Sequence, residues 1–304
     1  MSLMRRLALV TAAIATVACG NTPTEITPLP RSVGEVEGVL LQIDSLAPLD
    51  PSTQGVYVLW AIINRGEAKL LGEFFIDGSG TIVDDTGAPI EQFDSDDFSV
   101  RRTLSVLITI ETPSSLSDSP QGTQIMSGTF IDGVANLSVP ISTAIVDSSG
   151  SLRVFTPTDG PDTNESAGFW MIGEDGEPLL SIPDTTAALV FETFVEVQGR
   201  SLPVGRFERA DAADSVNQYS SPQFPAPEAP GEDLLLNAPE GVIFPADLSG
   251  ARISISLEGR ANDFVQQGQL VVLEAFLPGG LTGGETIPFV NRTASFPSGR
   301  AVLY

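Results

Sequence analysis

Side chains that could do chemistry are few in this chain of 304 residues. It has no histidine, one cysteine (Cys19) and one lysine (Lys69). The usual base of serine and cysteine hydrolases and the commonest zinc ligand are therefore missing. A nucleophilic serine would depend on Lys69, and no Ser-x-x-Lys pattern leads to that residue. The sequence thus argues against a nucleophilic hydrolase and against a zinc or iron site, and one cysteine permits no intrachain disulfide.

Carboxylates are the abundant chemical group, with 39 aspartates and glutamates. Paired carboxylates can act on glycans, but an acidic solvated surface has the same composition, so no single pair is informative. Acidic clusters that begin at Asp77, Asp94 and Asp159 lack the spacing and closing glutamate of an EF-hand. We interpret them as turns and predict no catalytic residue, no metal and no cofactor, with a weak calcium site as the alternative.

The charge balance restricts the partners. The formal net charge is -24, and such an acidic surface repels phosphate backbones, so we predict no nucleic-acid partner. The hydrophobic fraction of 42% is too high for a globally disordered chain. The 29 glycines and 23 prolines, among many Val, Ile, Thr and Phe residues, favour short strands and turns.

The N-terminus has the organisation of an export signal. Arg5 and Arg6 precede a short apolar run, 7–17, and then Ala18 and Cys19. A membrane-spanning helix needs ~20 apolar residues, so this run is too short to span comfortably.

The tail of this signal, Thr16-Val17-Ala18-Cys19, resembles a bacterial lipobox, although Thr16 departs from the usual Leu, Val or Ile. The resemblance implies a lipoprotein signal peptide at 1–18 and fatty acylation, including palmitate, on Cys19. It also implies a protein anchored in the bacterial cell envelope through its N-terminal lipid. By analogy with lipoprotein sorting, Gly20 implies the outer membrane, facing the periplasm or the surface. An ordinary cleaved signal with an incidental cysteine is the alternative.

The rest of the chain is organised around one hairpin pattern. Residues 19–34 are rich in Pro and Thr, so we expect a flexible tether. Residues 55–75 predict two strands joined by a turn at Asn64-Arg65-Gly66, and residues 189–207 are a weaker copy. Further similar segments follow in the same order in both halves; residues 252–258, for example, resemble residues 105–111.

We therefore predict an all-β fold of two tandem β-sandwich domains, Ig-like or related, at 35–148 and 149–304, because no segment has sustained helical periodicity. Two unrelated β-domains and a single large barrel are the alternatives.

One face of the central strand is unusually apolar. In the second copy, Glu192, Phe194 and Glu196 alternate with a buried face, whereas the first copy has Val58, Trp60 and Ile62 at these places. Contiguous exposed apolar patches are rare, so something should cover these residues. We expect either another part of the chain or a binding partner there, which makes Val58, Trp60 and Ile62 a candidate interaction face.

Four short motifs suggest a family. Residues 57–60 (Tyr-Val-Leu-Trp), 71–74 (Leu-Gly-Glu-Phe), 109–111 (Thr-Ile-Glu) and 120–122 (Pro-Gln-Gly) resemble the extracytoplasmic C-terminal domain of the anti-sigma-K factor family. The resemblance covers about 36–139 and, degenerately, 179–277. It implies an extracytoplasmic β module that senses or binds.

The departures from that family limit what carries over. The sigma-binding helical domain and the transmembrane helix of those proteins have no counterpart here, so sigma-factor inhibition is not implied. We predict a non-enzymatic envelope lipoprotein that binds or senses, with an unknown envelope protein as a possible partner. The alternative is a glycan-binding module, or a carbohydrate-active enzyme that uses carboxylates beside an exposed tryptophan.

Overall fold

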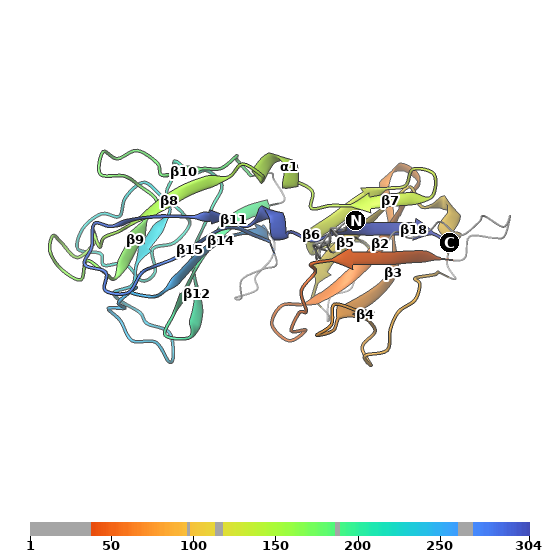
Figure 1. Cartoon of the computed structure of the whole chain (residues 1–304), viewed down its shortest axis with the longest axis horizontal. Helices are drawn as coiled ribbons and strands as arrows, with labels where there is room; N and C mark the ends of the chain where they lie inside the picture. Colours follow the sequence, from red (N-terminus) through yellow and green to blue (C-terminus); the bar gives the residue numbers. More distant parts are fainter. Residues whose placement is uncertain (1–37, 96–97, 113–117, 186–188, 261–269) are drawn as a thin grey trace, which may run out of the picture. The chain divides into compact units, whose positions relative to one another are not determined.

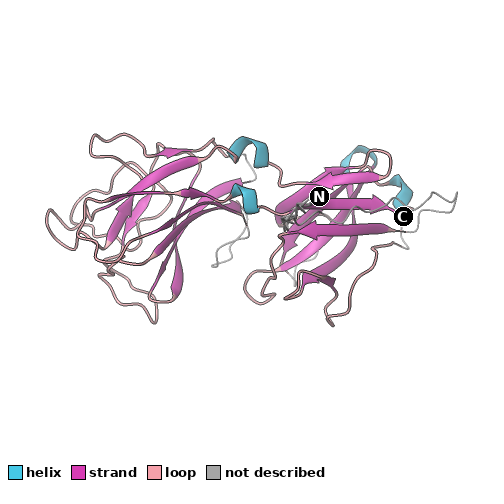
Figure 2. Ribbon diagram, in the orientation of Figure 1, coloured by secondary structure: helices cyan, strands magenta, loops and turns pink. Residues whose placement is uncertain are grey.

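The computed structural model describes residues 38–304 apart from 96–97, 113–117, 186–188 and 261–269. Strands make up 43% and helices 5% of the described residues, which confirms the predicted all-β class (Figure 2). Residues 36–304 cluster as one compact unit. The predicted signal peptide, the tether and Cys19 lie outside the described residues.

The first sheet pair combines a five-stranded sheet, in the order β4-β3-β2-β5-β6, with a three-stranded sheet, in the order β1-β18-β7 (Figure 1). All the neighbouring strands in it are antiparallel. Its strands are β1 (Val39–Asp44), β2 (Val56–Ile63), β3 (Glu67–Ile76), β4 (Ile82–Val83), β5 (Ser105–Glu111), β6 (Thr123–Thr129), β7 (Val134–Leu137) and β18 (Ser298–Leu303).

The second sheet pair combines a sheet in the order β12-β11-β14-β15-β17 with a sheet in the order β10-β8-β9-β13, in which β16 also pairs with β8. Its strands are β8 (Ser149–Val154), β9 (Gly168–Trp170), β10 (Leu180–Ser181), β11 (Leu189–Val197), β12 (Arg200–Phe207), β13 (Gly231–Asp233), β14 (Arg252–Gly259), β15 (Val271–Phe276), β16 (Thr286–Pro288) and β17 (Val290–Asn291). The short helical turns are η1 (Asn64–Gly66), η2 (Val100–Arg102), α1 (Ser142–Ile145) and η4 (Thr293–Ser295).

Turn chemistry sets the two central hairpins. Gln198 and Gly199 join β11 to β12 with φ of 51° and 74°, and positive φ at both central residues is the requirement of a type I′ turn. The turn between β2 and β3 is the helical turn η1, which ends on Gly66 at φ 88°. Glycine reaches this left-handed region without the steric cost that a Cβ would add.

Four strands of the sheet that contains β2 match four strands of the sheet that contains β11, whereas the remaining edge strands, β4 and β17, lie at opposite edges. β2 lies between β3 and β5, and β11 lies between β12 and β14. Tyr57 stacks on Phe74 at 5.3 Å between ring centroids, and Phe191 meets Phe207 at 5.5 Å. Even the register shifts coincide; they fall between Leu59 and Trp60, between Thr193 and Phe194, between Ile108 and Thr109, and between Ile255 and Ser256.

The last strand departs from the predicted domain boundary. We expected residues 149–304 to form the second domain, but β18 lies between β1 and β7 of the first sheet pair (Figure 1, blue beside yellow-green). Strand order follows from hydrogen-bond pairing across the sheet, which a boundary drawn along the sequence cannot anticipate. The first sheet pair is thus completed by residues 298–303.

Candidate functional site

An open groove of about 390 Å³ lies at one end of the sheet that contains β11, β14 and β15. The hairpin turn between β11 and β12, the segment that enters β14 and the end of β15 form its walls. The lining residues are Glu196, Val197, Gln198, Gly199, Asp247, Ser249, Gly250, Ala251, Arg252 and Phe276.

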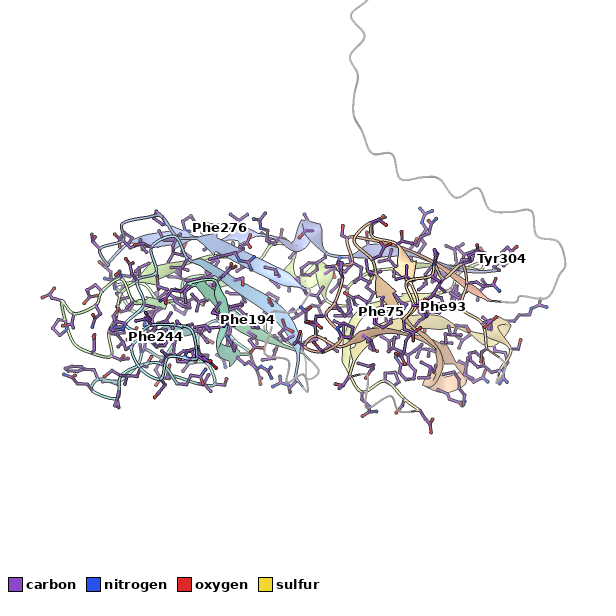
Figure 3. The ribbon with its side chains drawn as sticks, turned by 90° about the horizontal axis from the view of Figure 1, so that it is seen from below. Phe75, Phe93, Phe194, Phe244, Phe276 and Tyr304 are labelled. Atoms are coloured by element: carbon purple, nitrogen blue, oxygen red, sulfur yellow. The ribbon has the colours of Figure 1, made fainter. Side chains whose placement is uncertain are left out.

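Cross-strand pairing aligns three of these side chains. Glu196 of β11 is opposite Arg252 of β14, and Arg252 is opposite Phe276 of β15. Directly paired residues point to the same side of a sheet, so a carboxylate, a guanidinium and an aromatic ring form one row. Phe276 is 60% exposed, which makes its ring available at the groove (Figure 3).

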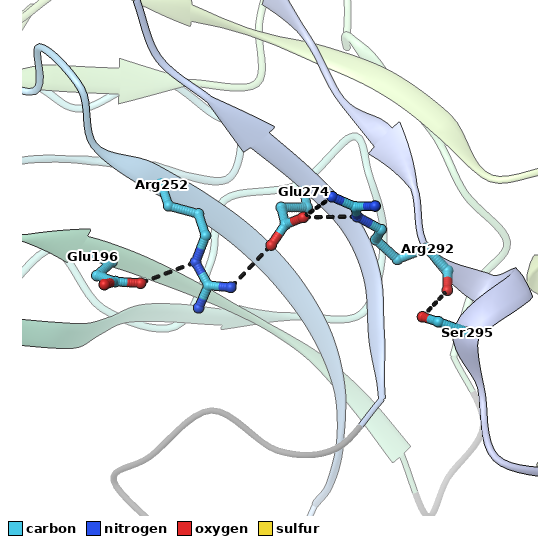
Figure 4. A network of polar contacts seen from close by, with 5 residues as sticks. All are labelled: Glu196, Arg252, Glu274, Arg292 and Ser295. Atoms are coloured by element: carbon cyan, nitrogen blue, oxygen red, sulfur yellow. Dashed lines mark hydrogen bonds and ion pairs between the residues drawn. The ribbon is translucent and has the colours of Figure 1, made fainter. Parts of the chain in front are cut away.

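Arg252 is fixed in this row by two carboxylates (Figure 4). Its Nε lies 3.0 Å from Glu196 Oε2, and its Nη1 lies 2.9 Å from Glu274 Oε1. Arg292 Nε donates to the other oxygen of Glu274 at 2.7 Å. Single exposed ion pairs contribute little to stability, but a network holds its charged groups in one arrangement. Because the Glu274 side chain is only 8% exposed and that of Glu196 is 49% exposed, Glu274 anchors the network and Glu196 faces the solvent.

The opposite wall supplies a second carboxylate. Asp247 Oδ1 accepts from the backbone N–H of Ser249 at 2.9 Å, and this hydrogen bond holds the pKa of Asp247 below its usual value. Gln198 is fixed by two hydrogen bonds to the backbone of Ile243, of 2.9 and 3.0 Å. The groove therefore joins an exposed ring to two carboxylates and a guanidinium, groups that can stack on a ligand and hydrogen-bond its hydroxyls.

The predicted interaction face lies inside the protein. Val58 and Trp60 have no exposed surface, and Ile62 is partly buried. Trp60 Nε1 donates to Thr109 Oγ1 at 2.9 Å, and that hydroxyl donates to Glu111 Oε1 at 2.6 Å. Since a buried indole N–H with a buried partner belongs to a packed interior, these residues are not a free surface for a partner. The alternative that the sequence left open, coverage within the chain, agrees with this burial.

Three carboxyl groups that the sequence analysis did not single out gather in the interior of the second sheet pair. Glu232 and Asp233 of β13 are completely buried, and Asp214 is partly buried. Asp233 accepts from Trp170 Nε1 at 2.7 Å and from the backbone N–H of Thr158 at 2.9 Å. Its carboxylate therefore has partners for both oxygens.

Asp214 and Glu232 are less well matched. Asp214 accepts from the Gly231 backbone N–H at 3.1 Å, and Glu232 Oε1 is bonded to the Ser220 hydroxyl, but Asp214 Oδ1 and Glu232 Oε2 are buried without a partner. Burial raises the pKa of Asp214 to about 7 and that of Glu232 to about 8, and the Asp214 charge adds to the second shift. Both carboxyls therefore hold protons more tightly than in water.

The sequence contained one signal for this cluster. Glu232 and Asp233 directly precede the apolar run Leu234-Leu235-Leu236 and follow Gly231. A charged pair in such a context marks the edge of a buried segment. The segment that holds this pair is rich in proline and acids, and its fold depends on contacts with distant residues such as Thr158 and Trp170.

The acidic cluster that begins at Asp77 forms the predicted turns, whereas residues 96–97 of the cluster that begins at Asp94 lie outside the described residues. Asp77 Oδ1 accepts from the backbone N–H groups of Ser79 and Thr81, and Asp84 does the same for Thr86 and Ala88. Among the residues that the structure describes, no group of three or more His, Cys, Asp and Glu side chains is placed to hold a metal ion. No helix within the described residues is both long and apolar enough to cross a membrane.

Comparison with known proteins adds no relative: no protein-family model, no curated protein and no solved structure matches this chain.

Proposed function

We propose that this chain is a non-enzymatic lipoprotein of the bacterial cell envelope that acts by binding or sensing, with the groove beside Phe276 as its binding site. The observation that carries the binding role is the exposed Phe276 ring in one row with Arg252 and Glu196. The anchor rests on the lipobox-like residues before Cys19. The relation to anti-sigma-factor extracytoplasmic domains rests on the motif resemblance alone.

The chemistry of the groove supports binding over catalysis. A general acid for glycan hydrolysis needs a carboxyl whose pKa is raised, so that it carries a proton at neutral pH. In the groove, the pKa of Asp247 is lowered, and Glu196 is paired with Arg252. The carboxyls with raised pKa, which include Glu192 of β11 and Glu232 of β13, do not line the groove.

The anchor is tested by Cys19→Ala in the full chain. We expect the variant to leave the membrane fraction and to lose metabolic labelling with palmitate. A variant that remains with the membranes would contradict the anchor.

A second candidate function, glycan binding, is favoured by the same groove. An aromatic ring stacks on the apolar face of a sugar, and carboxylates and guanidinium groups bond its hydroxyls. Both tryptophans are buried, so Phe276, not the exposed tryptophan of the sequence-based alternative, provides the ring.

The ligand class is tested by calorimetric titration with soluble bacterial envelope polysaccharides. Phe276→Ala removes the ring from the groove, and Phe224→Ala is the matched control because Phe224 is 42% exposed and does not line the groove. We expect binding that Phe276→Ala weakens ~10-fold or more and Phe224→Ala leaves unchanged, since a stacking contact contributes ~1–2 kcal/mol. Absence of any binding, or an equal loss in both variants, would remove the glycan candidate.

A further inference from the structure

Two strands, β8 and β18, lie outside the two repeats and each pairs with strands of the repeat that it does not directly follow. β18 follows β17 of the second sheet pair but lies between β1 and β7 of the first. β8 follows β7 of the first sheet pair but pairs with β10, β16 and β9 of the second. The strand that follows each repeat therefore completes the other sheet pair, and the exchange is reciprocal.

The two exchanged strands occupy equivalent positions. Each begins with Ser-Gly, at Gly150 in β8 and Gly299 in β18. A Cβ at Gly150 would lie 2.7 Å from the Leu179 carbonyl oxygen, and a Cβ at Gly299 would lie 2.2 Å from that of Gln42. The same close backbone approach thus positions both strands against their neighbours.

Main-chain pairing holds β18 more than side-chain burial does. It forms six residue pairs with β1 and four with β7, yet Ala301 is its one fully buried side chain. The six residues 292–297, which include η4, connect it to β17. A strand bound mainly through its backbone leaves two open edges when it departs, and open edges pair with another strand.

We propose that the position between β1 and β7 is a strand-binding site that accepts residues 298–303 of a second copy of this chain, so that two copies form a strand-exchanged dimer. The incoming strand has the same sequence and forms the same pairs, so only the connecting segment 292–297 changes its path. The exchange between the two halves of one chain shows that this position is filled by a strand from another repeat. This inference is independent of the groove and its ligand.

Cysteine cross-linking between copies tests the proposal. Gln42 and Arg300 are exposed and directly opposite each other across β1 and β18. Two full-length variants are mixed: one carries Cys19→Ala and Gln42→Cys, and the other carries Cys19→Ala and Arg300→Cys. The mixture is concentrated to ~1 mM, which matches the effective concentration that a short linker gives two parts of one chain, and it is then diluted and oxidised. The matched control mixes Gln42→Cys with Thr282→Cys, an exposed position outside β18.

We expect the disulfide between positions 42 and 300 of different copies to form ~10-fold more than the control disulfide and to increase with the concentration during mixing. A chain with both Gln42→Cys and Arg300→Cys should form the intrachain disulfide when dilute, which verifies the pairing in the folded protein. Mixed disulfides no more frequent than the control would overturn the proposal. Failure of the intrachain disulfide would overturn it too, because the proposed site depends on that register.

Discussion

Glu232→Gln tests whether the buried carboxyl cluster opposes folding at neutral and alkaline pH. Glu232 has no exposed surface, and its pKa is raised to about 8 by burial. Glutamine keeps an oxygen for the Ser220 hydroxyl and places an N–H₂ group where Glu232 Oε2 has no partner. The substitution therefore removes a titrating group and nearly preserves its shape.

The sign of the effect follows from proton linkage. A carboxyl whose folded-state pKa is raised keeps its proton while the unfolded chain loses it, so stability falls as pH rises from about 4.5 to about 8. A pH of about 7 lies roughly 2.5 units above the unfolded-state pKa, and this gap corresponds to ~3 kcal/mol of lost stability. A pH of about 5 lies only roughly half a unit above that pKa, and the loss there is less than ~1 kcal/mol. Glu232→Gln should therefore stabilise the protein by ~2–3 kcal/mol near pH 7 and hardly at all near pH 5.

Urea unfolding followed by the fluorescence of the buried tryptophans measures this difference. Exposed Glu240→Gln is the matched control and should change stability little at either pH. Asp233→Asn should destabilise by ~1–3 kcal/mol, because an amide cannot accept from Trp170 and Thr158 through both of its ends. Equal stabilisation by Glu232→Gln at both pH values, or destabilisation, would refute the reasoning.

Three further substitutions or cuts test the fold. Trp60→Ala should cost ~3–5 kcal/mol in urea unfolding, because the side chain is fully buried; unchanged stability would show that Trp60 lies on a surface. Gly299→Ala should weaken the pairing of β18 with β1 and speed amide exchange there, since its Cβ would meet the Gln42 carbonyl, whereas Gly279→Ala has open space and should be neutral. Cleavage at an inserted protease site at exposed Val146, between β7 and β8, should leave both fragments together on gel filtration, because β18 joins the second fragment to β1 and β7; separated fragments would contradict that pairing.

Local pattern predicted most of the central strands. The alternation at 55–63 and 189–197 and the turns between the hairpin strands correspond to β2, β3, β11 and β12. The echo between 105–111 and 252–258 corresponds to β5 and β14 in matching registers. These features depend on residue period and turn chemistry, which are local properties.

Long-range pairing and burial were not predictable in the same way. The β18 sequence Ser-Gly-Arg-Ala-Val-Leu has no alternation that predicts which strands it pairs with, and the strands it pairs with lie more than half the chain away in sequence. The residues Glu192 and Phe194 alternate with a buried face, so the pattern predicts that they are exposed to solvent. Both residues are buried, however, and Glu192 is paired with Arg206. The groove combines turn and strand-end residues from three parts of the chain, so it exists only after the sheet has formed.

The central claim, that this protein acts by binding through the groove beside Phe276, is tested most directly by affinity capture from its own cell envelope. The wild-type chain, Phe276→Ala and Phe224→Ala are immobilised at equal density, and the retained components are quantified by mass spectrometry. We predict a component that the wild type and Phe224→Ala retain equally and that Phe276→Ala loses ~10-fold or more, as expected when a stacking ring is removed. Equal retention by all three proteins would contradict the groove as the binding site.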